Sequence, residues 1–282
     1  LTNQIENLLL SLLGQGYKEQ EIEAAYSLAL SRWRSWQKAA ARGEAPHLEN
    51  QLRFVGSHDL AIEYLAEEVA KQSDYSVTTS YRGSLGGLMA LARGEADIAG
   101  SHLWDEESNL YNVPYVQRVL VGERIALVTV AGRSFGLILP AGNRQSITSL
   151  SDLSNQGIRW INRQPGSGTR VWLDAQLKQL GVDTTAIEGY EETKTTHNEI
   201  AETIKNGGAN AGLGIQAAAS AYGLDFIPLA QEVYQLVIPE TVWDTAVCQE
   251  LLTILQKEPF IETVTSFGGY DTTETSNTLW VG

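Results

Sequence analysis

The chain has 282 residues, 43% of them hydrophobic, and a formal net charge of −14. This length suits one large domain or two moderate ones. The acidic balance argues against a chain that grips a nucleic-acid backbone, which needs clustered positive charge. The sequence has neither an apolar run of the roughly 18 to 20 residues that span a membrane nor a secretory signal.

Residues 1–50 differ in pattern from the rest. Apolar residues at helical spacing on either side of Gly14 and Gly16 predict a helical hairpin. Residues 39–50 are polar and read as a linker. We expect the hairpin to pack on the main domain or to form a homodimer through residues 1–45. Because the chain starts at Leu1 rather than Met, we expect that a signal, a tag or an N-terminal domain once preceded it.

From residue 51 onward, short apolar strands alternate with amphipathic helices, which predicts an α/β fold. Three strand-to-helix turns are rich in glycine, hydroxyl groups or histidine. Such a turn can hold an anion, because the first N–H groups of a helix are unpaired and its dipole favours negative charge. Ser84 is placed to cap the helix at 85–92. The three turns are residues 56–59, 81–87 and 163–170.

A faint internal repeat predicts two lobes. Residues 88–100 and 200–214 both read as a helix end, then Gly, x, Ala, Asp or Asn, and a small-residue strand. Strands expected at 124–130 and 135–140, on either side of Gly132, and a returning strand at 233–239 would connect the lobes. We expect residues 51–282 to form one ligand-binding domain with a cleft that closes on its ligand. Lobe 1 would comprise about 51–130 and 238–282, and lobe 2 about 131–237.

The positions of the histidines in the sequence support a site between these lobes. Of four histidines, His58, His102 and His197 fall in or beside the expected loops, although each could simply cap a helix. A metal site is not expected. The one cysteine, Cys248, lies in an apolar helical stretch, and neither His-x-x-x-His nor Cys-x-x-Cys spacing occurs.

The chain from about residue 52 to 275 resembles the periplasmic-binding-protein-like domain of the molybdate/tungstate-binding type. That domain is often fused behind a helix-turn-helix in bacterial regulators. The residues that carry the resemblance are 56–59 (GSHD), 83–91 (GSLGGLMAL), 94–100 (GEADIAG), 111–115 (YNVPY), 162–164 (NRQ), 166–170 (GSGTR), 196–197 (TH), 211–215 (AGLGI) and 269–272 (GYDT).

The resemblance implies a type II periplasmic-binding-protein-like fold, two-lobed with a cleft, and a bound oxyanion, molybdate or tungstate, with no cofactor. The N-terminal hairpin is weakly similar to the helices that follow the winged helix in GntR-type regulators. On that view, DNA would be contacted only through a domain that is missing here.

The chemistry of molybdate agrees with these turns. At neutral pH it is a tetrahedral dianion without a proton, so a selective site offers only hydrogen-bond donors. Each charge-assisted bond from an arginine or histidine would be worth roughly 1.5–3 kcal/mol. Arg170 could instead pair with an acid on its own helix. Asp59 could accept the proton of hydrogen phosphate or serve as a first-turn acid. The expected ligand-binding residues are Ser57, His58, Ser84, Arg163, Ser167, Thr169, Arg170 and His197.

We expect a non-enzymatic, cytoplasmic oxyanion sensor of a transcriptional regulator. The alternative is the substrate-binding protein of an oxyanion ABC transporter, which would be periplasmic. An enzyme that uses His58, His102 or His197 as a general base ranks lowest, because no nucleophile–base–acid spacing stands out in the sequence.

Overall fold

The structure is a computed structural model that describes Ile22 and residues 50–282. The helical hairpin, linker and dimer contact expected in residues 1–50 therefore fall, apart from Ile22 and Asn50, outside the described residues. Within the described part of the chain, no helix is both long enough and apolar enough to cross a membrane.

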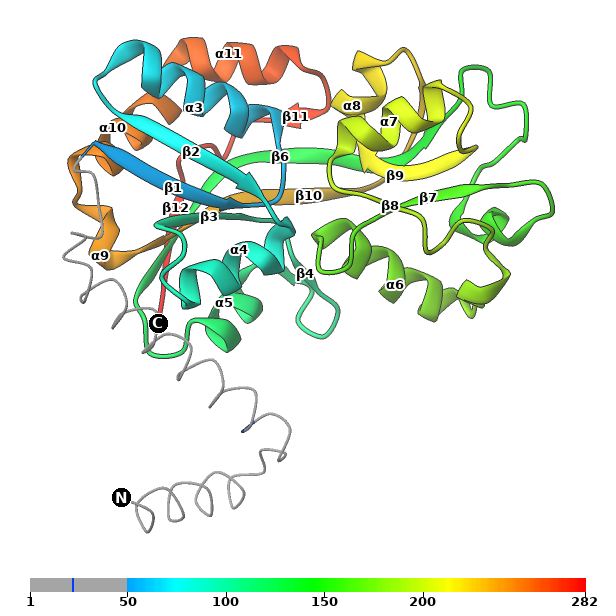
Figure 1. The fold of residues 1–282 in the computed structure, drawn as a ribbon, viewed down its shortest axis with the longest axis horizontal. Helices are drawn as coiled ribbons and strands as arrows, with labels where there is room; N and C mark the ends of the chain where they lie inside the picture. The colour runs from blue at the N-terminus through cyan, green and yellow to red at the C-terminus, as the bar shows by residue number, and fades with distance from the viewer. Residues whose placement is uncertain (1–21, 23–49) are drawn as a thin grey trace.

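One mixed β-sheet runs through both halves of residues 50–282 (Figure 1). Three parallel strands form one end and three more form the other, and two long antiparallel strands lie between these groups. Because the long strands cross the middle, both halves share a continuous backbone ladder. The strand order is β2 (Ser76–Tyr81), β1 (Gln51–Gly56), β3 (Ile98–Ser101), β10 (Asp225–Pro239), β6 (Ile125–Leu139), β9 (Ala211–Ile215), β7 (Trp160–Arg163) and β8 (Thr193–Lys194).

Helices cover both faces of the sheet (Figure 1). On one face, apolar residues of both halves join in a single core, from Leu65 on α3 to Ile204 on α7. The other face carries a separate core in each half. The first face holds α3 (Leu60–Gln72), α7 (His197–Lys205), α8 (Gln216–Ala221), α10 (Ala246–Leu255) and α11 (Glu258–Ser266). The second holds α4 (Gly83–Ala92), α5 (Val113–Val119) and α6 (Gly168–Leu180).

Short elements complete the fold. A two-stranded sheet lies apart from the main one, and two further strands pair with β6. These elements are β4 (Trp104–Asp105), β5 (Leu110–Tyr111), β11 (Tyr270–Asp271), β12 (Thr278–Val281), η1 (Leu150–Ser154), η2 (Thr184–Ala186) and α9 (Glu240–Trp243).

The prediction of two strands separated at Gly132 is wrong, because β6 is one continuous strand of 15 residues. Gly132 pairs with Val233 on β10 and lies beside β11. A Cβ at this position would lie only 3.3 Å from the Cβ of Asp271. The glycine thus makes room for a neighbouring strand and does not break its own.

The prediction that Ser84 caps the helix after the second turn is also wrong. Helix α4 begins at Gly83, whose φ of 77° suits glycine, and its N-cap is Arg82. Ser84 therefore lies in the first turn, where its Oγ accepts a hydrogen bond from the backbone N–H of His102 at 3.2 Å. Its side chain thus joins α4 to the residue that follows β3.

Candidate functional site

The three predicted turns converge where the two halves meet. The Leu85 N–H of α4 donates to the Gly166 carbonyl, at 3.2 Å, in the turn before α6. A Cβ at Gly168 would lie 2.7 Å from Nδ1 of His102, so the start of α6 can approach β3 this closely only with glycine there. All eight predicted ligand-binding residues are buried, none more than 9% exposed.

A buried hydrogen-bonded relay starts at the first turn. The Oγ of Ser57 lies 2.9 Å from Nε2 of His102, and Nδ1 of His102 lies 2.8 Å from Oε2 of Glu232. Sequence separations of 45 and 130 residues hid this serine, histidine and acid from sequence analysis. The serine is fully enclosed, and Arg133 holds the other oxygen of Glu232.

Arg133 is a fully buried cation whose charge is balanced. Its guanidinium donates to Glu232 and, at 2.5 Å, to Oδ2 of Asp59, and it stacks over the ring of Tyr234. Burial opposes the charged form, but the two carboxylates raise the pKa of Arg133 above its ordinary value. Burial likewise opposes ionisation of Glu232, yet Arg133 and His102 lower its pKa to about 2. Both charges therefore persist inside the protein.

Asp59 has a structural role. Its Oδ1 accepts from the Ala61 N–H at 2.8 Å as the N-cap of α3, and its Oδ2 accepts from Arg133 and from the Tyr270 hydroxyl. The structure thus places this acid at the N-cap, one residue before the first turn where it was expected. Asp59 therefore contributes to the fold through the cap of α3 and its ion pair with Arg133.

Arg163, at the end of β7, is a buried cation without such balance. Its NH2 donates to the Thr195 carbonyl at 2.8 Å and its Nε to Oε1 of Gln164 at 3.2 Å. Its NH1 has no hydrogen-bond partner in the described part of the chain, and no carboxylate described there pairs with it. Burial, then the charge of Arg133, lower the pKa of Arg163 to about 10, so it remains charged at neutral pH.

Further unpartnered polar atoms accompany this cation. Both ring nitrogens of His197, Oγ1 of Thr169 and Oγ of Ser101 are buried with no partner within residues 50–282. The rings of His197 and His102 lie 6.4 Å apart. Burial, followed by Arg163 and Arg133, holds the pKa of His197 well below its ordinary value, so its ring is neutral at pH 7. Each buried polar group left without a partner costs about 1–3 kcal/mol, so these atoms are candidates for contact with a ligand.

The other predicted residues have partners of their own. Ser84 and Ser167 use their oxygens to accept backbone N–H groups, which leaves each hydroxyl hydrogen free to donate. His58 lies 3.0 Å from Glu63, and its Nδ1 remains unpartnered among the described residues. Arg170 pairs with Asp174 at 2.8 Å and stacks over a tyrosine ring, as the structural alternative for this residue expects.

Sequence analysis missed Arg133 and Glu232, which organise the centre of the site. Arg133 stood in the sequence as a lone cation inside the apolar run of β6. Such a residue must be paired if the strand is buried. That signal could have flagged it, but its partners lie 74 and 99 residues away and no local pattern identifies them.

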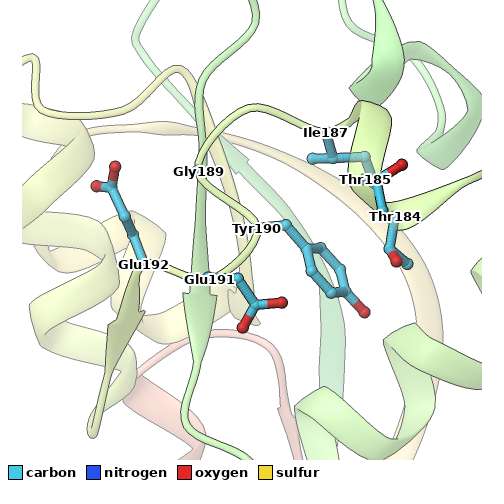
Figure 2. Close-up of a pocket in the computed structure, with 7 residues that line it drawn as sticks. All are labelled: Thr184, Thr185, Ile187, Gly189, Tyr190, Glu191 and Glu192. Atoms are coloured by element: carbon cyan, nitrogen blue, oxygen red, sulfur yellow. The ribbon is translucent and has the colours of Figure 1, made fainter.

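A hollow on the surface lies around Tyr190 (Figure 2), whose ring stacks with Arg170. It has a volume of about 360 Å³ and is lined by Thr184, Thr185, Ile187, Gly189, Tyr190, Glu191 and Glu192. Two carboxylates among its lining residues disfavour an anion there. The described residues also contain no group of three or more His, Cys, Asp or Glu side chains positioned to hold a metal ion.

Comparison with known proteins supports a binding domain. The family model of the PBP superfamily domain matches residues 66–256. The uncharacterised protein YvgK of Bacillus subtilis (strain 168) is 35% identical over 226 residues, covering 80% of this chain and 73% of YvgK. A protein encoded in the 5′ region of a 2Fe-2S ferredoxin gene of Clostridium pasteurianum is 32% identical over 106 residues, 37% of this chain and 94% of that protein.

Solved structures share the fold at low sequence identity. A substrate-binding protein assigned to phosphate ABC transport in Clostridium perfringens, with bound phosphate, gives a TM-score of 0.58 at 15% identity, covering 79% of this chain and 99% of that one. The tungstate ABC transporter structure from Geobacter sulfurreducens gives 0.56 at 14% identity, covering 78% of this chain and 100% of that one. With the family match over residues 66–256, these likenesses show that the chain belongs to the periplasmic-binding-protein (PBP) superfamily.

Proposed function

We propose that the protein binds a tetrahedral oxyanion, molybdate or tungstate in the first instance, between its two halves. The observation that carries this proposal is Arg163, a fully buried guanidinium with an unpartnered NH1 and no carboxylate partner among the described residues. A buried charge that is not paired is costly. An anion beside Arg163 removes that cost and satisfies the polar atoms around it.

The donors around Arg163 suit a ligand that has no proton. Thr169 and His197 hold buried atoms without partners in the described part, and Ser84 and Ser167 keep hydroxyl hydrogens to donate. His58 and Arg170 each keep one buried nitrogen, but Glu63 contacts the other ring nitrogen of His58 and Asp174 pairs with Arg170. Charge compensation of the ligand therefore rests on Arg163.

Two relatives by fold support an oxyanion as the ligand class, since one holds bound phosphate and another is a tungstate transport protein. We propose lobes of about 51–130 with 238–282, and 131–237, joined by β6 and β10. Membership in a family of binding proteins supports a non-enzymatic role.

The biological role that we propose is a cytoplasmic sensor that regulates transcription, with residues 1–45 as the dimer contact and DNA bound by a further domain. The alternative is the periplasmic component of an oxyanion transporter, which the solved relatives favour. The sequence encoded upstream of Leu1 separates the two. A helix-turn-helix there supports the sensor, and a signal peptide supports the transporter.

Titration calorimetry with molybdate, tungstate, sulfate and phosphate tests the proposal. We expect at least one of these anions to bind with a dissociation constant well below millimolar and a stoichiometry of one per chain. Sulfate is smaller than molybdate and should bind more weakly if the site fits the larger anion. The proposal fails if all four anions bind no more tightly than millimolar.

A further inference from the structure

The contacts among Ser57, His102 and Glu232 determine where the hydrogen atoms of this relay lie. Glu232 is ionised between Arg133 and His102, so its oxygens can only accept. The 2.8 Å contact from Nδ1 of His102 to Oε2 therefore requires hydrogen on Nδ1. Burial lowers the pKa of His102, and its ring is neutral at pH 7. Nε2 then carries a lone pair.

This tautomer determines what Ser57 can do. Its Oγ lies 2.9 Å from Nε2 of His102, so its hydroxyl hydrogen must point at that lone pair. Toward any other neighbour, the Ser57 oxygen can only accept a hydrogen bond. Ser57 was expected to donate to a proton-free anion, and in this tautomer it presents a lone pair instead.

A proton on His102 reverses the direction of the relay. Nε2 gains an N–H bond and donates to Ser57, whose hydroxyl hydrogen is then free to turn toward the ligand. The imidazolium lies between the serine oxygen and the carboxylate of Glu232, which stabilises its charge. An anion that carries its own hydrogen needs no such change, because it can donate to Ser57.

We propose that the Ser57–His102–Glu232 relay gives every oxyanion complex one proton: His102 takes it from solvent when the anion has none, and a singly protonated anion brings its own. This inference rests on the proposed function and refines it. His102 and Glu232 thereby act as positioning residues that set how the site distinguishes molybdate or sulfate from hydrogen phosphate as pH changes.

The groups around His102 identify it as the histidine that takes up the proton. It faces Glu232 and the stacked ring of Tyr234 on β10, Arg133 on β6, and Arg163 on β7. His197 on α7 lies 6.4 Å away. His197 also lies near both arginines, but no carboxylate pairs with it in the described part of the chain. Glu232 therefore makes protonation of His102 the less costly event.

Calorimetry in buffers of different ionisation enthalpy counts the protons. At pH 8, where hydrogen phosphate predominates, we expect molybdate to bind with uptake of close to one proton and phosphate with close to none. Molybdate affinity should fall by about tenfold per pH unit as pH rises. Molybdate binding without proton uptake overturns the inference and leaves the proposed function standing. If no anion binds, the proposed function itself fails.

Variants and spectroscopy locate the proton. The chain has only four histidines, so ¹⁵N spectra of the imidazole rings are tractable. We expect molybdate to convert His102 from the Nδ1–H form to the doubly protonated form, while phosphate leaves it unchanged. His102→Gln should abolish the proton uptake, and Arg159→Gln, at an exposed surface pair, should retain it. A proton that appears on His197 overturns the assignment, and the wild-type spectra decide this even if His102→Gln fails to fold.

Discussion

At the scale of single residues, two buried arginines that lie close together differ in how their charges are balanced. Arg133 is held between Asp59 and Glu232, whereas Arg163 has backbone and amide partners and one unpartnered nitrogen within the described residues. Their charges repel, which contributes to the lowered pKa of Arg163. The first arginine therefore stabilises the centre of the fold, and the second carries the charge on which the proposed anion site depends.

Removing the charge of Arg163 should separate binding from folding. We expect Arg163→Gln to weaken binding of the best of the four anions by about 10-fold to 150-fold, because one charge-assisted bond of about 1.5–3 kcal/mol is lost. Calorimetry measures the change. Arg159→Gln is the matched control. Arg159 directly precedes β7, the strand that holds Arg163, but its side chain is 48% exposed and pairs with Glu192 on the surface. Equal affinities of the two variants would contradict the role of Arg163.

The buried histidines should make stability depend on pH. The pKa values of His102 and His197 are lowered in the folded protein, so the unfolded chain binds more protons just below pH 6.5. Stability is then full above about pH 7 and is lost as pH falls below it, at up to about 1.4 kcal/mol per pH unit for each histidine. Glu232, whose pKa is about 2, acts in the same direction only at lower pH.

Urea unfolding between pH 5.5 and 7.5 measures this slope. We expect His197→Asn to reduce this slope by up to about one proton's worth, approaching 1.4 kcal/mol per pH unit toward pH 5.5. The same slope in the variant and in the wild type would show that His197 is not held neutral by the fold.

At the scale of elements, the site depends on how closely α6 approaches β3. The N-terminus of α6 is held by the cap of Ser167 on the Arg170 N–H, and Gly168 then lies against His102. A Cβ there would stand 2.6 Å from the carbonyl oxygen of His102, closer than real side chains come. Glycine is therefore needed at this contact between the two halves.

Gly168→Ala should keep the halves from closing fully. We expect anion affinity to fall by about tenfold or more, since about 1.4 kcal/mol corresponds to a factor of ten, with a small increase in the radius of gyration measured by X-ray scattering. Gly181→Ala at the other end of α6 is the control. Its Cβ would meet nothing within 4 Å, although its φ of 68° costs some stability. Unchanged binding by Gly168→Ala would show that the contact is not needed.

The order of elements could be predicted because it depends on local patterns. Alternating apolar runs and helical spacing indicated β1, α3, α6 and α10, and the glycine-rich turns indicated where helices begin. The relay could not be predicted, because Ser57, His102 and Glu232 come from three separate parts of the chain. Ser84 shows that prediction can fail even within a single turn, because its hydroxyl accepts a hydrogen bond from a distant backbone N–H and does not cap α4.

At the scale of the whole molecule, both halves rest on the same two strands and one shared core. β6 and β10 run antiparallel over 15 residues each, with register irregularities near Pro228 and Tyr234. Arg133 and Glu232 lie opposite one another on this pair of strands. The balanced ion pair thus belongs to the part of the fold that both halves share, which suits a pivot around a fixed centre.

Ligand should stabilise this whole unit. We expect saturating molybdate to raise the free energy of unfolding by about 2.7 kcal/mol at one hundred times the dissociation constant, seen as a higher melting temperature. The same addition should stabilise Arg163→Gln much less. Equal stabilisation of the two proteins would place the anion elsewhere on the chain.

The enclosure of Arg163 also bears on how the protein must be handled. A guanidinium that is sealed from water and has no carboxylate partner among the residues that the structure describes should retain a small anion from its surroundings, even through purification. Preparations made in phosphate or sulfate should therefore arrive already loaded. Elemental analysis of protein exchanged into chloride, before and after mild unfolding and refolding, would reveal which anion the living cell had left in place.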